Sequence, residues 1–252
     1  MTFEPSKAEA RHFFQQSSVV EHYALACNRV GLWESERQVI TEFFDPEGHL
    51  LELGCGAGRI AIGMYRLGYT QIVATDIAVA MVAEARRISS LLQYSIEFEV
   101  ADATHLHFED ATFAGAIFGF NGLMQILGRP NRQQAMREIF RVLKPGAHFV
   151  FTTHDRDAHW RRGFWKKQRA LWNTGQQHPA LVDFGDLFYE TPEGGMMYLH
   201  SPTCQEIRVD LKAASFEVVW DKLRSQMCRE SEQVRDFSDD CRFWVAQRPN
   251  AN

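Results

Sequence analysis

Three glycines at alternate positions stand at the centre of LELGCGAGR, residues 51–59. Gly54, Gly56 and Gly58 follow a short apolar run and precede a helical pattern, which predicts a strand, a tight turn and a helix N-terminus. Glycine lets the backbone approach a ligand that a Cβ atom would obstruct, and this geometry binds nucleotide-like ligands. Arg59 stands where a dinucleotide fingerprint has its third glycine, so the G-x-G-x-G spacing disfavours NAD.

Acidic side chains stand within or at the ends of the neighbouring apolar runs. Asp76 closes VATD, and a carboxylate at the end of a second parallel strand accepts two hydrogen bonds from a ribose diol in dinucleotide sites. The alternative for Asp76 is a turn or helix N-cap aspartate. Glu52 lies between two leucines, so a buried Glu52 carboxylate must find polar partners.

The apolar runs that position these residues alternate with helix-length segments. Five runs, rich in apolar or β-branched side chains, occupy residues 49–54, 71–77, 95–102, 113–120 and 147–155. A helical pattern at 131–143 ends at Lys144-Pro145-Gly146, because proline cannot continue a helix and glycine permits the turn. The alternation predicts an α/β, doubly wound, mostly parallel sheet with helices on both faces.

The remaining parts of the chain extend this arrangement. Residues 1–45 carry apolar side chains at helical spacing and form an N-terminal helical segment, whereas 46–252 form the main domain. A helix at 202–216 precedes two strand-like runs, 216–223 and 241–249. We expect these runs to pair antiparallel at the edge of the sheet, which gives seven strands with the last one antiparallel.

Composition sets the broad class of protein. The 252 residues include 45% hydrophobic side chains, enough for one large core. A net charge of −5 provides no global attraction to nucleic acid or anionic membrane, although a local basic patch remains compatible with it. Five cysteines without a C-x-x-C pair suggest neither disulfides nor a zinc site. Without an apolar signal core or membrane span, we expect a cytoplasmic protein.

Five pieces of sequence occur in one order along the chain. They are LELGCGAGR (51–59), Asp76 at the end of VATD, VADATHLHF with Asp102, FAGAIFGFN (113–121) and RVLKPGAHFVF (141–151). Together they resemble the class I S-adenosylmethionine-dependent methyltransferases of the small-molecule type. The resemblance covers about residues 48–155. It implies a Rossmann-like fold, S-adenosylmethionine as the cofactor, and a small-molecule methyl acceptor.

The resemblance also assigns cofactor contacts residue by residue. Asp76 would bind the ribose diol and Ile77 would pack against the adenine, although Ile77 also suits a core position. Asp102 would meet the adenine amino group beside the Ala103 backbone, with a helix-cap role as the alternative. The other contacts that it implies are Glu52, Gly54, Cys55, Gly56, Gly58, Arg59, Phe118, Asn121 and Tyr23.

Several of these residues have a second interpretation. Arg59 either meets the ligand carboxylate or pairs with Glu34 or Glu36, and Tyr23 either folds over that carboxylate or is an ordinary packed tyrosine. The turn at 118–121 should line the methyl-donor side, since it ends the fourth strand. Its sequence GFNGLM lacks the Asn/Asp-Pro-Pro-aromatic motif of nucleobase amino methyltransferases, which disfavours that activity.

Methyl transfer from a sulfonium is an in-line displacement, so the protein contributes mainly by positioning the acceptor. A general base matters only when the acceptor is a hydroxyl, a charged amine or a carbon acid. His154, beside Asp155 just beyond the fifth strand, is the candidate base because histidine titrates near neutral pH. A structural histidine is the alternative.

Residues 156–202 interrupt the strand–helix alternation, and we name them the cap. A connection of this length is expected to have structure of its own. A helix at 160–172 would place Trp160, Phe164, Gln168 and Trp172 on one face. A hairpin at 187–200 would turn at Pro192 to Gly195.

Two functions suit the cap helix. Its aromatic face would close the acceptor pocket, with arginine and lysine facing water. Alternatively, the basic and aromatic side chains would bind nucleic acid, which would suit an RNA- or protein-directed methyltransferase. The acidic overall charge favours the first. A non-methylating protein that binds S-adenosylmethionine is a further alternative.

Overall fold

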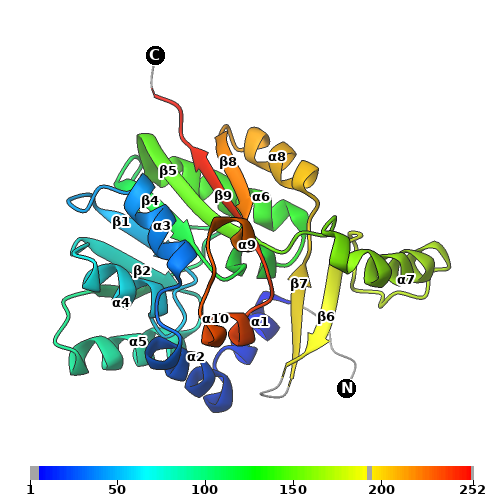
Figure 1. The fold of residues 1–252 in the computed structure, drawn as a ribbon, viewed down its shortest axis with the longest axis horizontal. Helices are drawn as coiled ribbons and strands as arrows, with labels where there is room; N and C mark the ends of the chain where they lie inside the picture. The colour runs from blue at the N-terminus through cyan, green and yellow to red at the C-terminus, as the bar shows by residue number, and fades with distance from the viewer. Residues whose placement is uncertain (1–5, 192–194, 251–252) are drawn as a thin grey trace.

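The computed structural model describes residues 6–191 and 195–250, and its main sheet has seven strands within these ranges. The strands are β1 (Leu50–Leu53), β2 (Ile72–Asp76), β3 (Glu97–Val100), β4 (Phe113–Phe118), β5 (Leu143–Thr153), β8 (Glu217–Leu223) and β9 (Arg242–Gln247). Their order is β3-β2-β1-β4-β5-β9-β8 (Figure 1). The first five pair in parallel, and β9 runs antiparallel to both β5 and β8. The predicted α/β fold and the antiparallel pairing of the last two strands are confirmed.

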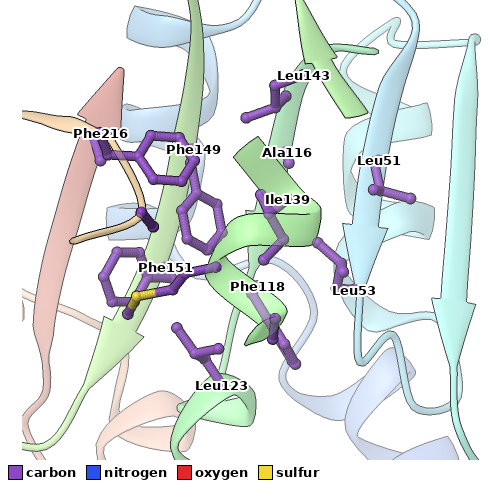
Figure 2. Packing of buried hydrophobic residues seen from close by; sticks show 14 of the residues in the cluster. Leu51, Leu53, Ala116, Phe118, Leu123, Ile139, Leu143, Phe149, Phe151 and Phe216 are labelled. Carbon is purple, nitrogen blue, oxygen red and sulfur yellow. The ribbon is translucent and has the colours of Figure 1, made fainter. Parts of the chain in front are cut away.

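Alternating side chains of each strand face two separate hydrophobic clusters. Leu51 and Leu53 join one cluster and Leu50 the other, because successive side chains of a strand point to opposite faces. Figure 2 shows the first cluster, in which Phe149 and Phe151 of β5 pack toward Ile139. Burial of one such phenylalanine stabilises the fold by about 1.5–3 kcal/mol.

Helices cover both faces of the sheet, as the crossover rule predicts. They are α3 (Glu34–Phe43), α4 (Arg59–Arg66), α5 (Val79–Leu91), α6 (Arg129–Val142) and α8 (Cys204–Ala213). Side chains of α6 and α8 enter the first cluster, and those of α3, α4 and α5 enter the second. Helix α6 ends where the Lys144-Pro145-Gly146 stop was predicted, but β5 begins at once at Leu143 instead of at residue 147. A register shift between Phe113 and Gly115 of β4 accommodates the extra residues.

The N-terminal segment forms α1 (Lys7–Phe13) and α2 (Ser17–Arg29), which precede α3. Phe13 and Val19 pack with Ala78 and Met81 at the start of α5. Two short helices, α9 (Arg224–Met227) and α10 (Glu232–Phe237), occupy the polar stretch between β8 and β9. In Figure 1, α1, α2 and α10 lie together at one end of the sheet.

The cap contains a 3-10 turn, η2 (His159–Arg161), then α7 (Arg162–Asn173) and a hairpin of β6 (Asp186–Glu190) with β7 (Met196–His200). The two strands pair antiparallel as expected, with Phe188 opposite Tyr198. Of the predicted turn, Pro192 to Gly194 lie outside the described residues.

The predicted buried face of the cap helix is wrong. Trp165 is buried, and both it and Trp172 meet the ring of Phe184 edge-on. Trp160 and Phe164 are instead 45% and 43% exposed. Trp160 belongs to the tighter 3-10 turn, so the spacing of the α-helix does not continue back to it.

None of the described helices is long and apolar enough to cross a bilayer.

Candidate functional site

A cavity of about 360 Å³ lies beside the carboxyl ends of β1, β2 and β4. The predicted cofactor contacts that line it are Tyr23, Glu52, Gly54, Cys55, Gly56, Arg59, Asp76, Ile77, Asp102, Ala103 and Phe118. Gly58, Asn121 and His154 are predicted site residues that do not line it. The structure therefore gathers most of the candidate residues at the edge where parallel strands end, the position expected for a ligand in an open α/β sheet.

The glycines of the loop after β1 have different surroundings. A Cβ atom on Gly56, whose φ is +53°, would have only the Tyr23 ring within 4 Å, at 3.6 Å. A Cβ atom on Gly58, φ +92°, would stand 3.1 Å from the Phe98 ring and 3.3 Å from the Ala85 Cβ. Gly56 thus keeps the cavity open toward α2, whereas Gly58 permits close packing behind the loop.

The Asp76 carboxylate joins the glycine loop to the start of α5. Its Oδ2 accepts a hydrogen bond from the Gly56 N–H and its Oδ1 accepts one from the Ala78 N–H, each at 2.9 Å. Burial raises the pKa of Asp76 above its ordinary value, and these backbone N–H groups oppose that rise. Each oxygen retains a second lone pair, so the carboxylate is equipped to receive a diol from the cavity.

Asp102 lies at another part of the cavity wall and contacts α1. Its carboxylate forms an ion pair with Lys7 and accepts hydrogen bonds from the Thr104 N–H at 3.0 Å and hydroxyl at 2.8 Å. Lys7 also donates to the Thr104 hydroxyl at 3.2 Å. Asp102 therefore organises a local turn, not the helix start that the capping alternative expected, and it also faces the cavity.

Glu52 places a buried carboxyl group at the cavity with one oxygen unpartnered. Its Oε2 has no hydrogen-bond partner among the described residues. Burial raises the pKa of Glu52 to about 8, although the positive charge of Arg59 opposes the rise. The group is thus mainly protonated at neutral pH, and a ligand cation would favour its ionised form.

Arg59 pairs with Glu36, the second of its two interpretations. Its Nη1 and Nη2 donate to the two Glu36 carboxylate oxygens at 2.6 Å, and Nη1 also donates to the Gly31 carbonyl at 2.8 Å. The guanidinium lies over the Trp33 ring, 4.9 Å from its centroid. Both terminal nitrogens are engaged within the protein, so this pair ties α3 to the start of α4.

Aromatic rings from distant segments form another wall of the cavity. Tyr23 meets Phe120 edge-on at 6.1 Å, and Phe120 stacks with Phe237 at 5.0 Å. Phe14 meets Tyr23 at 6.1 Å. Sequence reasoning missed Lys7, Phe14 and Phe237 as site residues. Phe237 lies in a short polar stretch without helical periodicity, so its spacing carried no usable signal.

The turn after β4 separates Asn121 and His154 from the cavity. Phe118 and Phe120 line the cavity, whereas Asn121 is buried, donates its N–H to the Thr152 hydroxyl and has a left-handed φ of 59°. Its Nδ2 lies 3.5 Å from the His154 Nε2.

The candidate general base is not placed for that role. Burial, with help from the Arg161 charge, lowers the pKa of His154 to about 4. Its Nδ1 lies 3.4 Å from the Arg161 Nη2, and its ring does not line the cavity. These contacts agree with the structural alternative for His154.

The sequence of this chain is similar to those of known methyltransferases. Residues 50–146 match the family model of a methyltransferase domain. The chain is 27% identical over 177 residues to the O-methyltransferase resE of Aspergillus sclerotiorum, covering 63% of this chain and 66% of that protein. It is 28% identical over 157 residues to the demethylmenaquinone methyltransferase of Symbiobacterium thermophilum, covering 58% and 61%. The matches thus span under two thirds of these relatives' own lengths.

Two solved structures share the fold. An S-adenosylmethionine-dependent methyltransferase of Methanosarcina mazei superposes with a TM-score of 0.67 at 22% identity, over 84% of this chain and 98% of that one. The [4+2]-cyclase SpnF superposes with a TM-score of 0.63 at 20% identity, over 92% and 96%. These findings show that residues 50–146 are similar to a methyltransferase domain and that the chain has the fold of these solved structures.

Proposed function

We propose that this protein is an enzyme that moves a methyl group from S-adenosylmethionine to a small-molecule acceptor. The single observation that carries the proposal is the cavity in which the glycine loop meets the buried Asp76 carboxylate, within the segment that matches the methyltransferase domain.

The residues present fit the cofactor. Gly56 leaves a space that a side chain would fill, and Asp76 offers two acceptor oxygens to a ribose diol. Glu52 supplies an unpartnered buried oxygen for the cationic ammonium of the ligand's amino acid part. Ile77 and Asp102 would hold the adenine. The bound cofactor would supply an activated methyl group on a positively charged sulfur.

The chain's own contribution is to bind and orient. Phe14, Tyr23, Phe120 and Phe237 surround the cavity with apolar surface, which excludes water from the acceptor. Correct alignment of two reactants lowers a barrier by up to about 7–11 kcal/mol in ideal cases. Because His154 lies outside the cavity, we propose that it is not the general base for an acceptor that requires one.

A small acceptor agrees with how the cavity is built. Residues of α1, α2 and α10 line it together with the strand ends, so chain segments enclose it from several sides. Two relatives are an O-methyltransferase and a demethylmenaquinone methyltransferase, whose names suggest small acceptors. The basic cap helix contributes no residue to the cavity, which disfavours acceptor selection by that helix in an RNA- or protein-directed enzyme.

A non-methylating activity is the second candidate, because SpnF has this fold and is a [4+2]-cyclase. The test is transfer of isotopically labelled methyl from S-adenosylmethionine to a panel of phenols, quinols, amines and carboxylates. Labelled product that depends on Asp76 supports methyl transfer. Tight binding of S-adenosylmethionine without transfer to any member, nor to RNA or protein substrates, favours the second candidate.

A further inference from the structure

The cap carries a segregated positive charge. Residues 158–182 contain five arginine and lysine side chains and no aspartate or glutamate. The chain as a whole has a net charge of −5, which leaves the residues outside this segment at −10. Such a concentration of one sign gives the segment a local field opposite to that of the rest of the protein.

Helix α7 also exposes apolar side chains that its own fold does not cover. Phe164 and Leu171 are 43% and 38% exposed, and their spacing of seven residues places them on the same side of the helix. Trp160 just before the helix is 45% exposed, and Val182 in the following loop is 67% exposed. Figure 1 shows α7 projecting beyond β6 and away from the main sheet.

Three of the basic side chains are available to a partner. Arg162, Lys166 and Lys167 are exposed and have no ion pair with any residue that the structure describes. Arg161, by contrast, pairs with Asp239, and Arg169 lies over the Phe184 ring. Lys167 lies on the helix between Phe164 and Leu171, so positive charge borders the apolar strip.

We propose that α7 is a docking surface for an anionic lipid bilayer. A helix that combines exposed aromatic and aliphatic side chains with adjacent lysine and arginine suits the membrane interface, where the apolar side chains enter the acyl boundary and the cations meet lipid phosphates. Trp160 and Phe164 could stack on bases, but the exposed aliphatic side chains of Leu171 and Val182 could not, and burial of all four in an acyl boundary favours lipid over nucleic acid. We name Trp160, Phe164, Lys167 and Leu171 the docking strip; Arg162 and Lys166 lie farther around the helix and add to its local positive field.

The test is co-sedimentation of the full chain with vesicles. One set is phosphatidylcholine alone and the other is equal parts phosphatidylcholine and phosphatidylglycerol. We expect binding to the anionic vesicles only, weakened by added salt. Lys167→Gln should lower the partition coefficient about fivefold, since a cation near such a surface contributes on the order of 1 kcal/mol. Phe164→Ser with Leu171→Ser should lower it about tenfold or more.

Matched controls lie on α8. Lys212→Gln removes an exposed lysine and Val209→Ser removes an exposed valine, and both should leave vesicle binding unchanged. Circular dichroism and the thermal shift caused by S-adenosylmethionine check that each variant is folded. Equal binding to neutral vesicles, no binding to either set, or equal losses in the controls would overturn the proposal.

Other partners give different outcomes. A dimer in sedimentation velocity that Phe164→Ser with Leu171→Ser dissociates, without vesicle binding, would assign the docking strip to a second copy and overturn the lipid proposal. Binding of a single-stranded oligonucleotide that requires Lys166 and Lys167 but not Phe164 and Leu171, again without vesicle binding, would overturn it in favour of nucleic acid.

Discussion

Two helical additions to the sheet domain, the N-terminal helices α1 and α2 and the cap, differ in what they contact. The N-terminal pair brings Lys7, Phe14 and Tyr23 to the cavity. The cap contributes no cavity residue among those described, although its aromatic helix was the predicted pocket lid. The cap instead has an internal polar network centred on the buried Asp186.

The difference shows what an amphipathic pattern can and cannot predict. Apolar spacing indicates that a helix packs, because its apolar face must leave water. It does not identify the surface that receives it. Helix α1 is joined to the cavity wall by Lys7, which contacts Asp102 and Thr104, whereas α7 uses Trp165 to pack on its own loop at Phe184.

The largest expected effect is the loss of stability on substitution of Asp186 in the cap. Its Oδ1 accepts from the Tyr198 hydroxyl at 2.6 Å and contacts His200 Nδ1 at 2.8 Å, while Oδ2 accepts from the Asp183 N–H at 2.8 Å. Asp186→Ala leaves these buried groups unpaired, so we expect the free energy of unfolding to fall by about 3–5 kcal/mol. Denaturant titration measures the loss.

The same variant should bind S-adenosylmethionine with unchanged affinity under conditions where it is folded, because none of these cap residues lines the cavity. Asp110→Ala, at an exposed carboxylate, is the control and should alter stability little. Lost cofactor binding in a folded Asp186 variant would mean that the cap does shape the site.

The Asp186 network also predicts a pH dependence. Burial would raise the pKa of Asp186, but hydrogen bonds from His200, Tyr198 and the Asp183 N–H outweigh it and hold the pKa below its ordinary value of 3.8. The unfolded chain therefore takes up this proton first as pH falls. The stabilisation is complete above the ordinary value and is lost as pH falls through the folded value. Urea titrations from about pH 6 to about pH 3 should show a shallower decline for Asp186→Asn than for the unsubstituted protein.

A second pair of variants removes one aromatic ring from the cavity wall and one from the cap. Phe237→Ala removes the ring that stacks on Phe120 in the cavity wall, so methyl transfer to an identified acceptor should fall about tenfold to a hundredfold through misplaced reactants. Trp172→Ala removes a ring from the cap and should leave turnover of the folded enzyme unchanged. Kinetics with labelled cofactor compare the two, and a larger loss in the Trp172 variant would reverse the assignment of roles.

The smallest expected effect concerns the tether of α1. Lys7 is half exposed, and the carboxylate of Asp102 is also held by Thr104. Lys7→Ala should therefore change the binding free energy of S-adenosylmethionine by less than about 1 kcal/mol. Calorimetry on the purified variant measures this directly. A much larger loss would make Lys7 a ligand contact instead of a tether.

The sequence predicted the central sheet because its strands are short apolar runs with clear interruptions. It also predicted that Gly56, Asp76 and Asp102 would lie together, since the carboxyl ends of parallel strands meet at one edge. Their roles toward a cofactor remain predictions.

The sequence did not predict which distant segments enclose the cavity. Phe14 and Phe237 are separated by more than two hundred residues and meet the cavity through tertiary packing alone. The sequence also could not decide whether Arg59 pairs with Glu34 or Glu36, because the two stand close together in the chain. Only the first turn of α3 distinguishes them. The predicted face of the cap helix was wrong at Trp160 because a 3-10 turn precedes α7, and at Phe164 because the helix buries the adjacent Trp165 against Phe184 instead.

Isothermal titration calorimetry tests the proposal that the cavity is an S-adenosylmethionine site built around Asp76. The unsubstituted protein should bind S-adenosylmethionine with one site per chain. Asp76→Asn keeps the shape but loses the charge and replaces one acceptor oxygen by an NH2 group that faces a backbone N–H, and it should weaken binding by about 1.5–3 kcal/mol or more. Asp110→Asn should bind as the unsubstituted protein does. Unchanged affinity in a folded Asp76→Asn variant, or no binding by the unsubstituted protein, would contradict the proposal.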